Sequence, residues 1–209
     1  MILHKVCPIC GSASLAGFAI DTVRNGPHIS RVKCRSCKLV FANPMADKME
    51  LAAYYENYYD KDLYEAIGYK DIIQNHFKRI STLNEKEIKS EALFLKHLGE
   101  GAKFLDVGCG LGLGLAYANK LKCQLYATEF DKGALEFVQD NFPVQTFQGD
   151  IWDAKYPDSF FDFVHISHVI EHVLDPKAYI NEMKRILKPG GYIAIGTPNM
   201  SSNLYKIHR

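Results

Sequence analysis

The chain has 209 residues, of which 47% are hydrophobic, and its formal net charge is +1 at pH 7. This length suits one full domain, or one domain with a small module, and the apolar content is sufficient for a sizeable core. The balanced charge argues against a nucleic acid or an anionic membrane as the partner. No apolar run reaches the length of a membrane span, and no signal-peptide core follows Met1. We therefore expect a cytoplasmic protein with reduced cysteines.

Four cysteines in two C-x-x-C pairs mark residues 1–46 as a separate module. Cys7 and Cys10 make the first pair, and Cys34 and Cys37 make the second. Each pair can place two thiolates on one ion, and two pairs together close a tetrahedral, four-thiolate zinc site. Because four thiolates leave no open coordination position, we expect structural rather than catalytic Zn²⁺.

The residues between the two pairs predict one β-hairpin. Residues 18–20 and 29–32 have the composition of strands, and Asn25-Gly26-Pro27 is typical of a turn. A module of this size buries little core, so bound metal would supply much of its folding free energy. A redox role is disfavoured, since neither pair opens a helix in a βαβ unit. The pattern indicates a zinc-ribbon-like module.

Residues 47–102 have the apolar spacing of helices, with Gly68 separating two patterns and Gly99 predicted to end the second. Six tyrosines gather around the first pattern: Tyr54, Tyr55, Tyr58, Tyr59, Tyr64 and Tyr69. They either pack an amphipathic helix against the domain or form a lid whose hydroxyls face a ligand. We describe this segment as a tyrosine-rich helical lid or linker.

The stretch Phe104–Gly114 organises the rest of the chain. A short apolar run meets Asp106, and glycine then occupies every second position from Gly108. This pattern predicts a buried strand, a tight turn and the start of a helix. Glycine permits a positive φ and close approach of a ligand to the backbone, and the first N–H groups of the helix face the same place. A nucleotide-like ligand is the first hypothesis.

Strands and helices alternate after this turn. Further strands are predicted at 124–128, 144–147, 161–166 and 192–196, helices at 115–121, 134–138 and 176–187, and a turn at 188–191. Asp175 is the expected N-cap of the last helix, with Pro176 at its first position. Such alternation predicts a doubly wound, parallel α/β sheet, in which ligands bind at the carboxyl ends of the strands.

Three carboxylates stand at successive strand ends. Glu129 can accept both hydroxyls of a ribose, and Asp150 can accept an adenine amine beside the apolar Ile151. Asp106 can face an ammonium group but would repel a pyrophosphate. The glycines follow G-x-G-x-G rather than the dinucleotide pattern G-x-G-x-x-G. Together these features describe an adenosine that carries a cationic amino-acid tail.

Residues 103–199 resemble a class I S-adenosylmethionine-dependent methyltransferase. The resemblance rests on an ordered series of motifs: Leu105–Gly112, Glu129, Gly149-Asp150, Phe161–Val164, Glu171–Pro176 and Leu187–Gly191. The front half is similar to bacterial small-molecule methyltransferases with an N-terminal zinc-binding module, including sugar C-methyltransferases. The resemblance implies a Rossmann-like domain over 103–209, S-adenosylmethionine as cofactor, and a small-molecule acceptor such as a sugar nucleotide.

The resemblance also implies roles for individual residues. The candidate cofactor-binding residues are Asp106, Gly108 and Gly110 for the methionine part, Glu129 for the ribose, and Asp150 with Ile151 for the adenine. Gly112, in the same turn as Gly110, is a further candidate cofactor-binding residue. Methyl transfer needs positioning, and a base where the nucleophile must lose a proton. His168 and His172 follow the fourth strand and are the catalytic candidates, with the tyrosines as the other candidates.

Relatives of this fold have two more strands after the fifth, whereas only ten residues follow Asn199 here. We therefore expect a truncated sheet, an incomplete acceptor site, and a bare strand edge that favours self-association. Two other functions stay open. One is an RNA methyltransferase whose zinc module grips RNA, which the near-neutral charge disfavours; the other is a non-catalytic binding module that retains the cofactor fold.

Overall fold

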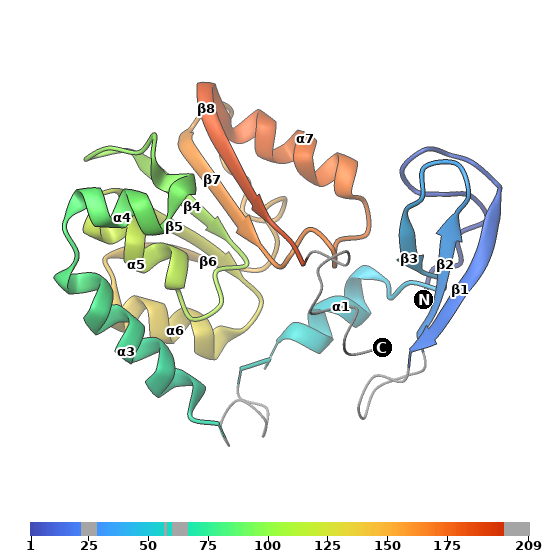
Figure 1. Cartoon of the computed structure of the whole chain (residues 1–209), viewed down its shortest axis with the longest axis horizontal. Coiled ribbons are helices and arrows are strands. Elements are labelled where there is room, and N and C mark those ends of the chain that lie inside the picture. The colour runs from blue at the N-terminus through green and yellow to red at the C-terminus, as the bar shows by residue number, and fades with distance from the viewer. Residues whose placement is uncertain (22–28, 57, 60–66, 199–209) are drawn as a thin grey trace. The chain divides into compact units, whose positions relative to one another are not determined.

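Figure 1 shows the computed structural model, which describes residues 1–21, 29–56, 58–59 and 67–198. Contacts between Cα atoms divide these residues into two compact units. One unit is Met1–Tyr54 with Leu174–Ala178, and the other is Tyr55–Val173 with the described residues from Tyr179 onward. The boundaries expected at residues 46 and 102 stay predictions.

The first unit contains a small antiparallel sheet with the strand order β1-β2-β3. Its strands are β1 (Leu15–Asp21), β2 (Ile29–Cys34) and β3 (Val40–Ala42). The two predicted strands are confirmed and pair antiparallel, with Leu15 opposite Cys34. The turn predicted at 25–27 lies outside the described residues. The short β3 adds an unpredicted third strand to the hairpin.

Helices connect this sheet to the larger one. They are α1 (Lys48–Tyr55), α3 (Tyr69–Thr82), α4 (Glu85–Glu91) and the 3₁₀ turn η1 (Leu93–Leu95). Gly68 precedes α3 with φ 61°, and Asn84 begins α4 through a reciprocal capping box with Glu87. The prediction that Gly99 ends this helical stretch is wrong, because η1 already ends at Leu95.

The second unit is built on a parallel five-stranded sheet with the order β6-β5-β4-β7-β8. The strands are β4 (Lys103–Val107), β5 (Gln124–Glu129), β6 (Val144–Gln148), β7 (Phe161–Ser167) and β8 (Leu187–Gly196). The connecting helices are α5 (Leu113–Lys120), α6 (Lys132–Asn141) and α7 (Pro176–Ile186). The predicted α/β class and the five strands are confirmed. The strand order reverses between β4 and β7, which is where α/β sheets bind ligands.

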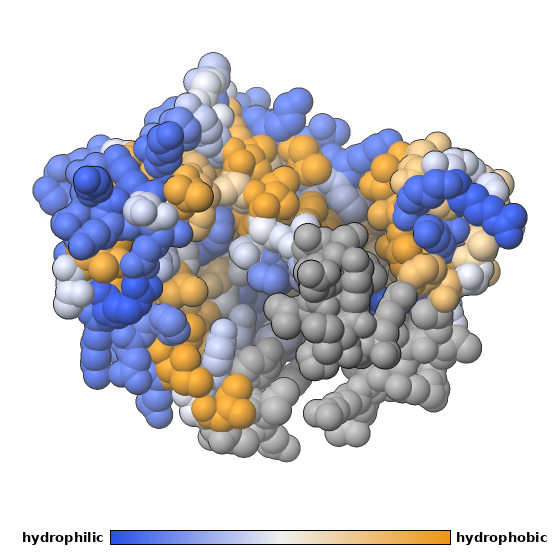
Figure 2. Space-filling model, viewed as in Figure 1, coloured by the Kyte–Doolittle hydropathy of each residue, from blue (hydrophilic) through white to orange (hydrophobic). Residues whose placement is uncertain are grey.

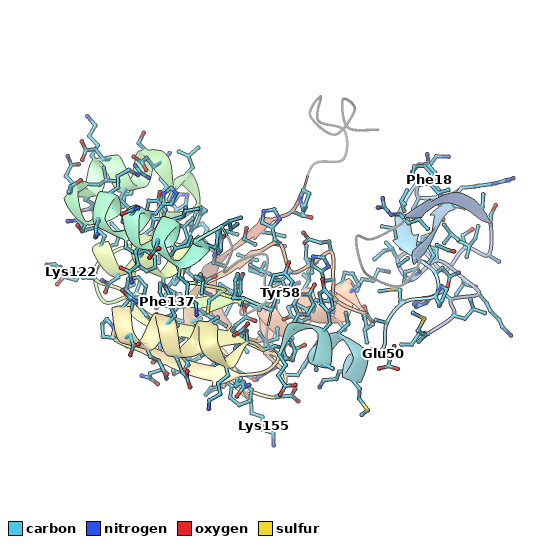
Figure 3. The ribbon with its side chains drawn as sticks, turned by 90° about the horizontal axis from the view of Figure 1, so that it is seen from below. Phe18, Glu50, Tyr58, Lys122, Phe137 and Lys155 are labelled. Carbon is cyan, nitrogen blue, oxygen red and sulfur yellow. The ribbon has the colours of Figure 1, made fainter. Side chains whose placement is uncertain are left out.

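Alternate residues of the strands enter two separate cores. Phe104 of β4 packs in the core that α3, α4, α5 and α6 cover, where Phe137 of α6 (labelled in Figure 3) lies 6.0 Å from Phe77 between ring centroids. Leu105, the next residue, packs in the other core with Tyr179 and Met183 of α7. Helices therefore cover both faces of the sheet, as the doubly wound prediction requires.

Strand β8 forms one edge of this sheet. The turn expected at 188–191 falls within its bounds, where the pairing with β7 is irregular and Gly190 has φ 78°. Tyr192 and Ile195 are each 45% exposed, and Figure 2 shows hydrophobic residues gathered beside β8. This is the edge at which we expect self-association, and that expectation stays a prediction.

Among the residues that the structure describes, none of the helices combines the length and the apolar character that a membrane crossing needs.

Candidate functional site

The turn between β4 and α5 depends on glycine. Gly108, Gly110 and Gly112 have φ of 63°, 50° and 82°, a region that other residues adopt only with strain. A Cβ atom on Gly108 would lie 2.4 Å from Val169 Cγ2, and one on Gly110 would lie 2.4 Å from Tyr59 Oη. Both the backbone conformation and the close neighbours therefore require glycine here.

Glu129 ties the end of β5 to this turn. Its Oε2 accepts a hydrogen bond from the Gly110 N–H at 2.9 Å, and its Oε1 accepts one from the Phe130 N–H at 2.7 Å. The residue is 8% exposed, and burial raises the pKa of its carboxyl although the surrounding N–H groups favour the charged form. The structure thus brings together two residues, Gly110 and Glu129, that the sequence assigned to one site.

Asp150 and Ile151 lie just beyond the end of β6, on the next strand of the sheet. Ile151 is fully buried, whereas Trp152 is 39% exposed and meets Tyr179 edge to face at 4.9 Å between ring centroids. Burial, followed by the charge of Asp150 and a hydrogen bond to it, raises the pKa of Tyr179. These residues form an apolar and aromatic border with one carboxylate, at the strand end where an adenine was expected.

Asp106 has a partner that the sequence did not suggest. Its Oδ1 lies 2.7 Å from Nδ1 of His165, and the two side chains are 4% and 13% exposed. The carboxylate was predicted to face an ammonium group of the ligand, and that role stays a prediction; within the protein, its partner is His165. His165 was missed because its neighbourhood depends on the strand register, which places it directly opposite Asp106.

Like His165, Tyr59 has a role in the site that the sequence did not reveal, because no motif distinguishes it from the other tyrosines. Its hydroxyl lies over Gly110, and its backbone N–H donates to Asp131 Oδ2 at 2.7 Å. Asp131 is fully buried and caps α6 through its other oxygen, which accepts from the Ala134 N–H at 2.9 Å. One carboxylate therefore anchors both the tyrosine segment and the helix that follows β5.

The rings of the tyrosine segment form a continuous series. Tyr58 (labelled in Figure 3) lies 5.3 Å from Tyr55 and 5.2 Å from Tyr59 between ring centroids, and Tyr59 stacks on Tyr69 at 6.1 Å. Tyr64 is outside the described residues. The packing and lid hypotheses both stay predictions.

The catalytic candidates lie together in the loop after β7. Glu171 Oε1 is 3.6 Å from His168 Nδ1 and 3.9 Å from His172 Nε2. His168 has φ 57° and is 68% exposed at its side chain. Burial lowers the pKa of His172 in spite of the nearby Glu171. The ring of His172, which is 49% exposed, also meets Tyr55 edge to face at 6.0 Å between centroids.

The four N-terminal cysteines form a cluster in the first unit. Their sulfur atoms all lie within 4.8 Å of one another, with Cys7 and Cys37 at 3.6 Å and Cys10 and Cys34 at 3.6 Å. Four thiolates on tetrahedral zinc at about 2.3 Å would be roughly 3.8 Å apart. The cluster therefore has the donor set and approximately the spacing that a zinc ion needs.

Both C-x-x-C pairs use the same local backbone. Gly11 N–H donates to the Cys7 carbonyl at 2.9 Å, and Lys38 N–H donates to the Cys34 carbonyl at 3.0 Å. The donors have nearly equal positive φ, 72° for Gly11 and 68° for Lys38. In the second turn, the backbone N–H of Cys37 is the main influence that lowers the pKa of the Cys34 thiol to about 6. The two C-x-x-C pairs of the sequence therefore fold into the same type of turn.

The fold and the glycine turn define a class of protein. A parallel sheet with a reversal beside β4, a left-handed glycine turn after that strand, and a buried carboxylate at the end of β5 also occur together in α/β domains that bind nucleotides. The G-x-G-x-G spacing separates it from the dinucleotide-binding kind.

Comparison with known proteins narrows this class. Residues 105–195 match the family model described as "Methyltransferase domain". A solved structure of an S-adenosylmethionine-dependent methyltransferase from Archaeoglobus fulgidus aligns with a TM-score of 0.50 at 22% identity, over 59% of this chain and 57% of the other. That likeness concerns the fold alone. Over residues 105–195 the sheet unit is thus similar to the methyltransferase domain of S-adenosylmethionine-dependent enzymes.

Two curated relatives are similar over the same part of the chain. A Mycolicibacterium smegmatis protein, named "Probable S-adenosylmethionine-dependent methyltransferase", is 30% identical over 50% of this chain and 41% of its own length. A demethylmenaquinone methyltransferase of Bacillus licheniformis is 28% identical over 54% of this chain and 52% of its own length. The chain therefore spans about half the length, or less, of these relatives.

Asp131→Ala tests the anchor between Tyr59 and α6. We expect the free energy of unfolding to fall by about 1–2 kcal/mol, because the variant loses an N-cap and leaves the Tyr59 N–H without its acceptor. Urea denaturation measures the effect. Asp140→Ala, at the exposed C-terminal end of the same helix, should be neutral or slightly stabilising. Equal losses in both variants would contradict the anchoring role.

Proposed function

We propose that this chain binds S-adenosylmethionine and belongs to an enzyme that methylates a small-molecule acceptor. The observation that carries the proposal is the hydrogen bond from Gly110 to Glu129. It joins the turn where a ligand can approach the backbone to a carboxylate at the next strand end. A neutral backbone turn beside a carboxylate suits a neutral ribose and a cationic ligand better than a pyrophosphate.

The described residues fit the cofactor part by part. In the proposed arrangement, Glu129 accepts the ribose hydroxyls, and Asp150 with the buried Ile151 holds the adenine. The turn of Gly108, Gly110 and Gly112 takes the methionine part, because its left-handed glycine backbone carries no side chain that would keep a ligand away. Asp106 contributes negative charge behind this turn. These residue roles are supported by their position at neighbouring strand ends.

The bound cofactor would supply an electrophilic methyl group for direct displacement. The protein's task is then to hold the acceptor in line and, where needed, to remove its proton. We propose His172 as the base, because partial burial lowers the pKa of its imidazole and so favours the neutral ring, which can accept a proton. His168 is the alternative base, and Glu171 stands between the two rings as their shared partner.

The acceptor is proposed only as a class. The Bacillus licheniformis relative is named for demethylmenaquinone, a small molecule, and its similarity supports a small-molecule acceptor for this chain. A sugar nucleotide remains the acceptor suggested by the front half of the sequence. The near-neutral net charge supports neither RNA nor DNA as substrate.

We propose that Cys7, Cys10, Cys34 and Cys37 hold a structural zinc ion. The support is geometric, since four sulfurs gather within 4.8 Å on two identical turns. Four thiolates would fill a tetrahedral site, so the ion would stabilise the module and take no part in the reaction. Free thiolates persist in a reducing compartment, which makes the cytoplasm the proposed location.

Glu129→Ala tests the cofactor site. We expect the dissociation constant for S-adenosylmethionine to rise about tenfold or more, equivalent to roughly 1.4 kcal/mol, because a buried acceptor of the ribose is lost. Isothermal titration calorimetry measures the binding, and Glu136→Ala on the exposed face of α6 is the matched control. Unchanged affinity in Glu129→Ala would refute the site, and no binding by the wild-type chain would refute the function.

Cys34→Ser tests the metal proposal. The variant should lose its zinc in metal analysis, because three thiolates and a hydroxyl hold the ion far more weakly. Cys123→Ser, at a cysteine of the sheet unit, should keep the wild-type zinc content. Full retention of zinc in Cys34→Ser would contradict the four-thiolate site.

A further inference from the structure

Asp106 and His165 form a buried pair at the strand reversal. They are directly opposite each other on β4 and β7, the neighbouring parallel strands between which the order reverses. Asp106 Oδ1 and His165 Nδ1 are 2.7 Å apart, and both side chains are almost fully buried. The proposed reaction uses neither the ring of His165 nor this hydrogen bond.

The carboxylate is turned under the first turn of α5. A Cβ atom on Gly114 would lie 2.5 Å from Asp106 Oδ2 and 2.9 Å from His165 Nδ1, so the glycine makes room for the pair. An anion is favoured at this end of a helix. Both oxygens of Asp106 therefore lie against protein atoms: Oδ1 against His165 and Oδ2 against Gly114. Asp106 itself lies next to last in β4, just before the turn that the cofactor is proposed to contact.

The surroundings of the imidazole favour its charged form. Phe94 stacks on the ring at 4.6 Å and Phe104 lies at 6.0 Å between centroids. Burial opposes a charged ring, but the charge of Asp106 and the hydrogen bond to it outweigh burial and raise the pKa of His165.

Two other titratable groups belong to the surroundings of this pair. They are the buried Cys109, whose thiol pKa is raised by burial and then by the charges of Asp106 and Glu129, and Glu129, which interacts with Cys109. Neither brings positive charge. Of the titratable groups named here, only a protonated His165 carries the positive charge that can balance the negative charge of Asp106.

We propose that His165 is a positioning residue of the cofactor site, and that its proton competes with the cationic amino-acid end of the cofactor for the charge of Asp106. This inference rests on the proposed function. When His165 is protonated, the pair is neutral and attracts the cofactor's cationic end weakly. When His165 is neutral, it still donates its ring N–H and holds the carboxylate in place, but the negative charge of Asp106 is no longer cancelled.

The consequence is a link between cofactor binding and the loss of a proton. Since the charged ring opposes binding, affinity should fall as the pH is lowered through the raised pKa of His165. A pair that only supports α5 would predict no such link, because its geometry persists in both protonation states.

Calorimetric titration with S-adenosylmethionine between about pH 6 and pH 8.5 tests the inference. We expect the wild-type affinity to fall by about fivefold to tenfold toward the lower pH. His165→Asn places a non-titrating N–H donor near the same position, so its profile should be much flatter. His97→Asn, at an exposed histidine of the same unit, should keep the wild-type profile. The cofactor's own titration is common to all three proteins and cancels in the comparison.

Parallel profiles for wild type and His165→Asn would overturn the inference while leaving the proposed function intact. Failure of the wild-type chain to bind at any pH would overturn both. A second measurement needs no variant: binding to the wild-type chain at the pH below 7 where its affinity changes most steeply, compared in two buffers of different ionisation enthalpy, should show proton release. No proton exchange there would also overturn the inference.

Discussion

The hydrogen bond between Gly110 and Glu129 is the contact on which the proposed site depends. It crosses from the turn after β4 to the end of β5, and it is buried. The turn can reach Glu129 only because its glycines adopt a left-handed backbone that other residues would strain. The order of the strands then places Asp150 on one side and the loop of His168 and His172 on the other. One short contact thus sets the position of the proposed ribose site relative to both neighbours.

Elements with strong local signals were predictable from the sequence. The five parallel strands follow from short apolar runs, and Asp175 was expected as an N-cap and accepts a hydrogen bond from the Ala178 N–H at 3.0 Å. The helix end predicted at Gly99 was wrong. A glycine after an apolar run is typical of a helix end, but the glycine alone does not show that the helix extends that far. The helix had already given way to a 3₁₀ turn ending at Leu95.

What the sequence did not reveal depends on long-range register. Asp106 and His165 are 59 positions apart, and only the parallel pairing of β4 with β7 makes them neighbours. The same holds for Tyr59 and Asp131, which meet across 72 positions. No motif marks His165 or Asp131, Tyr59 was only one of six tyrosines, and the motif that contains Asp106 predicts a ligand contact rather than a histidine partner. The cysteine pairs are different, since their chemistry is written into a four-residue spacing and the structure gathers all four sulfurs.

A crystal structure of this chain with S-adenosylhomocysteine would test the proposed cofactor site. Both ribose hydroxyls should lie within hydrogen-bond distance of the Glu129 carboxylate, with the amino-acid end of the ligand against Gly108 and Gly110. A nucleoside bound elsewhere, with Glu129 still joined only to the backbone of its own turn and of Gly110, would contradict it.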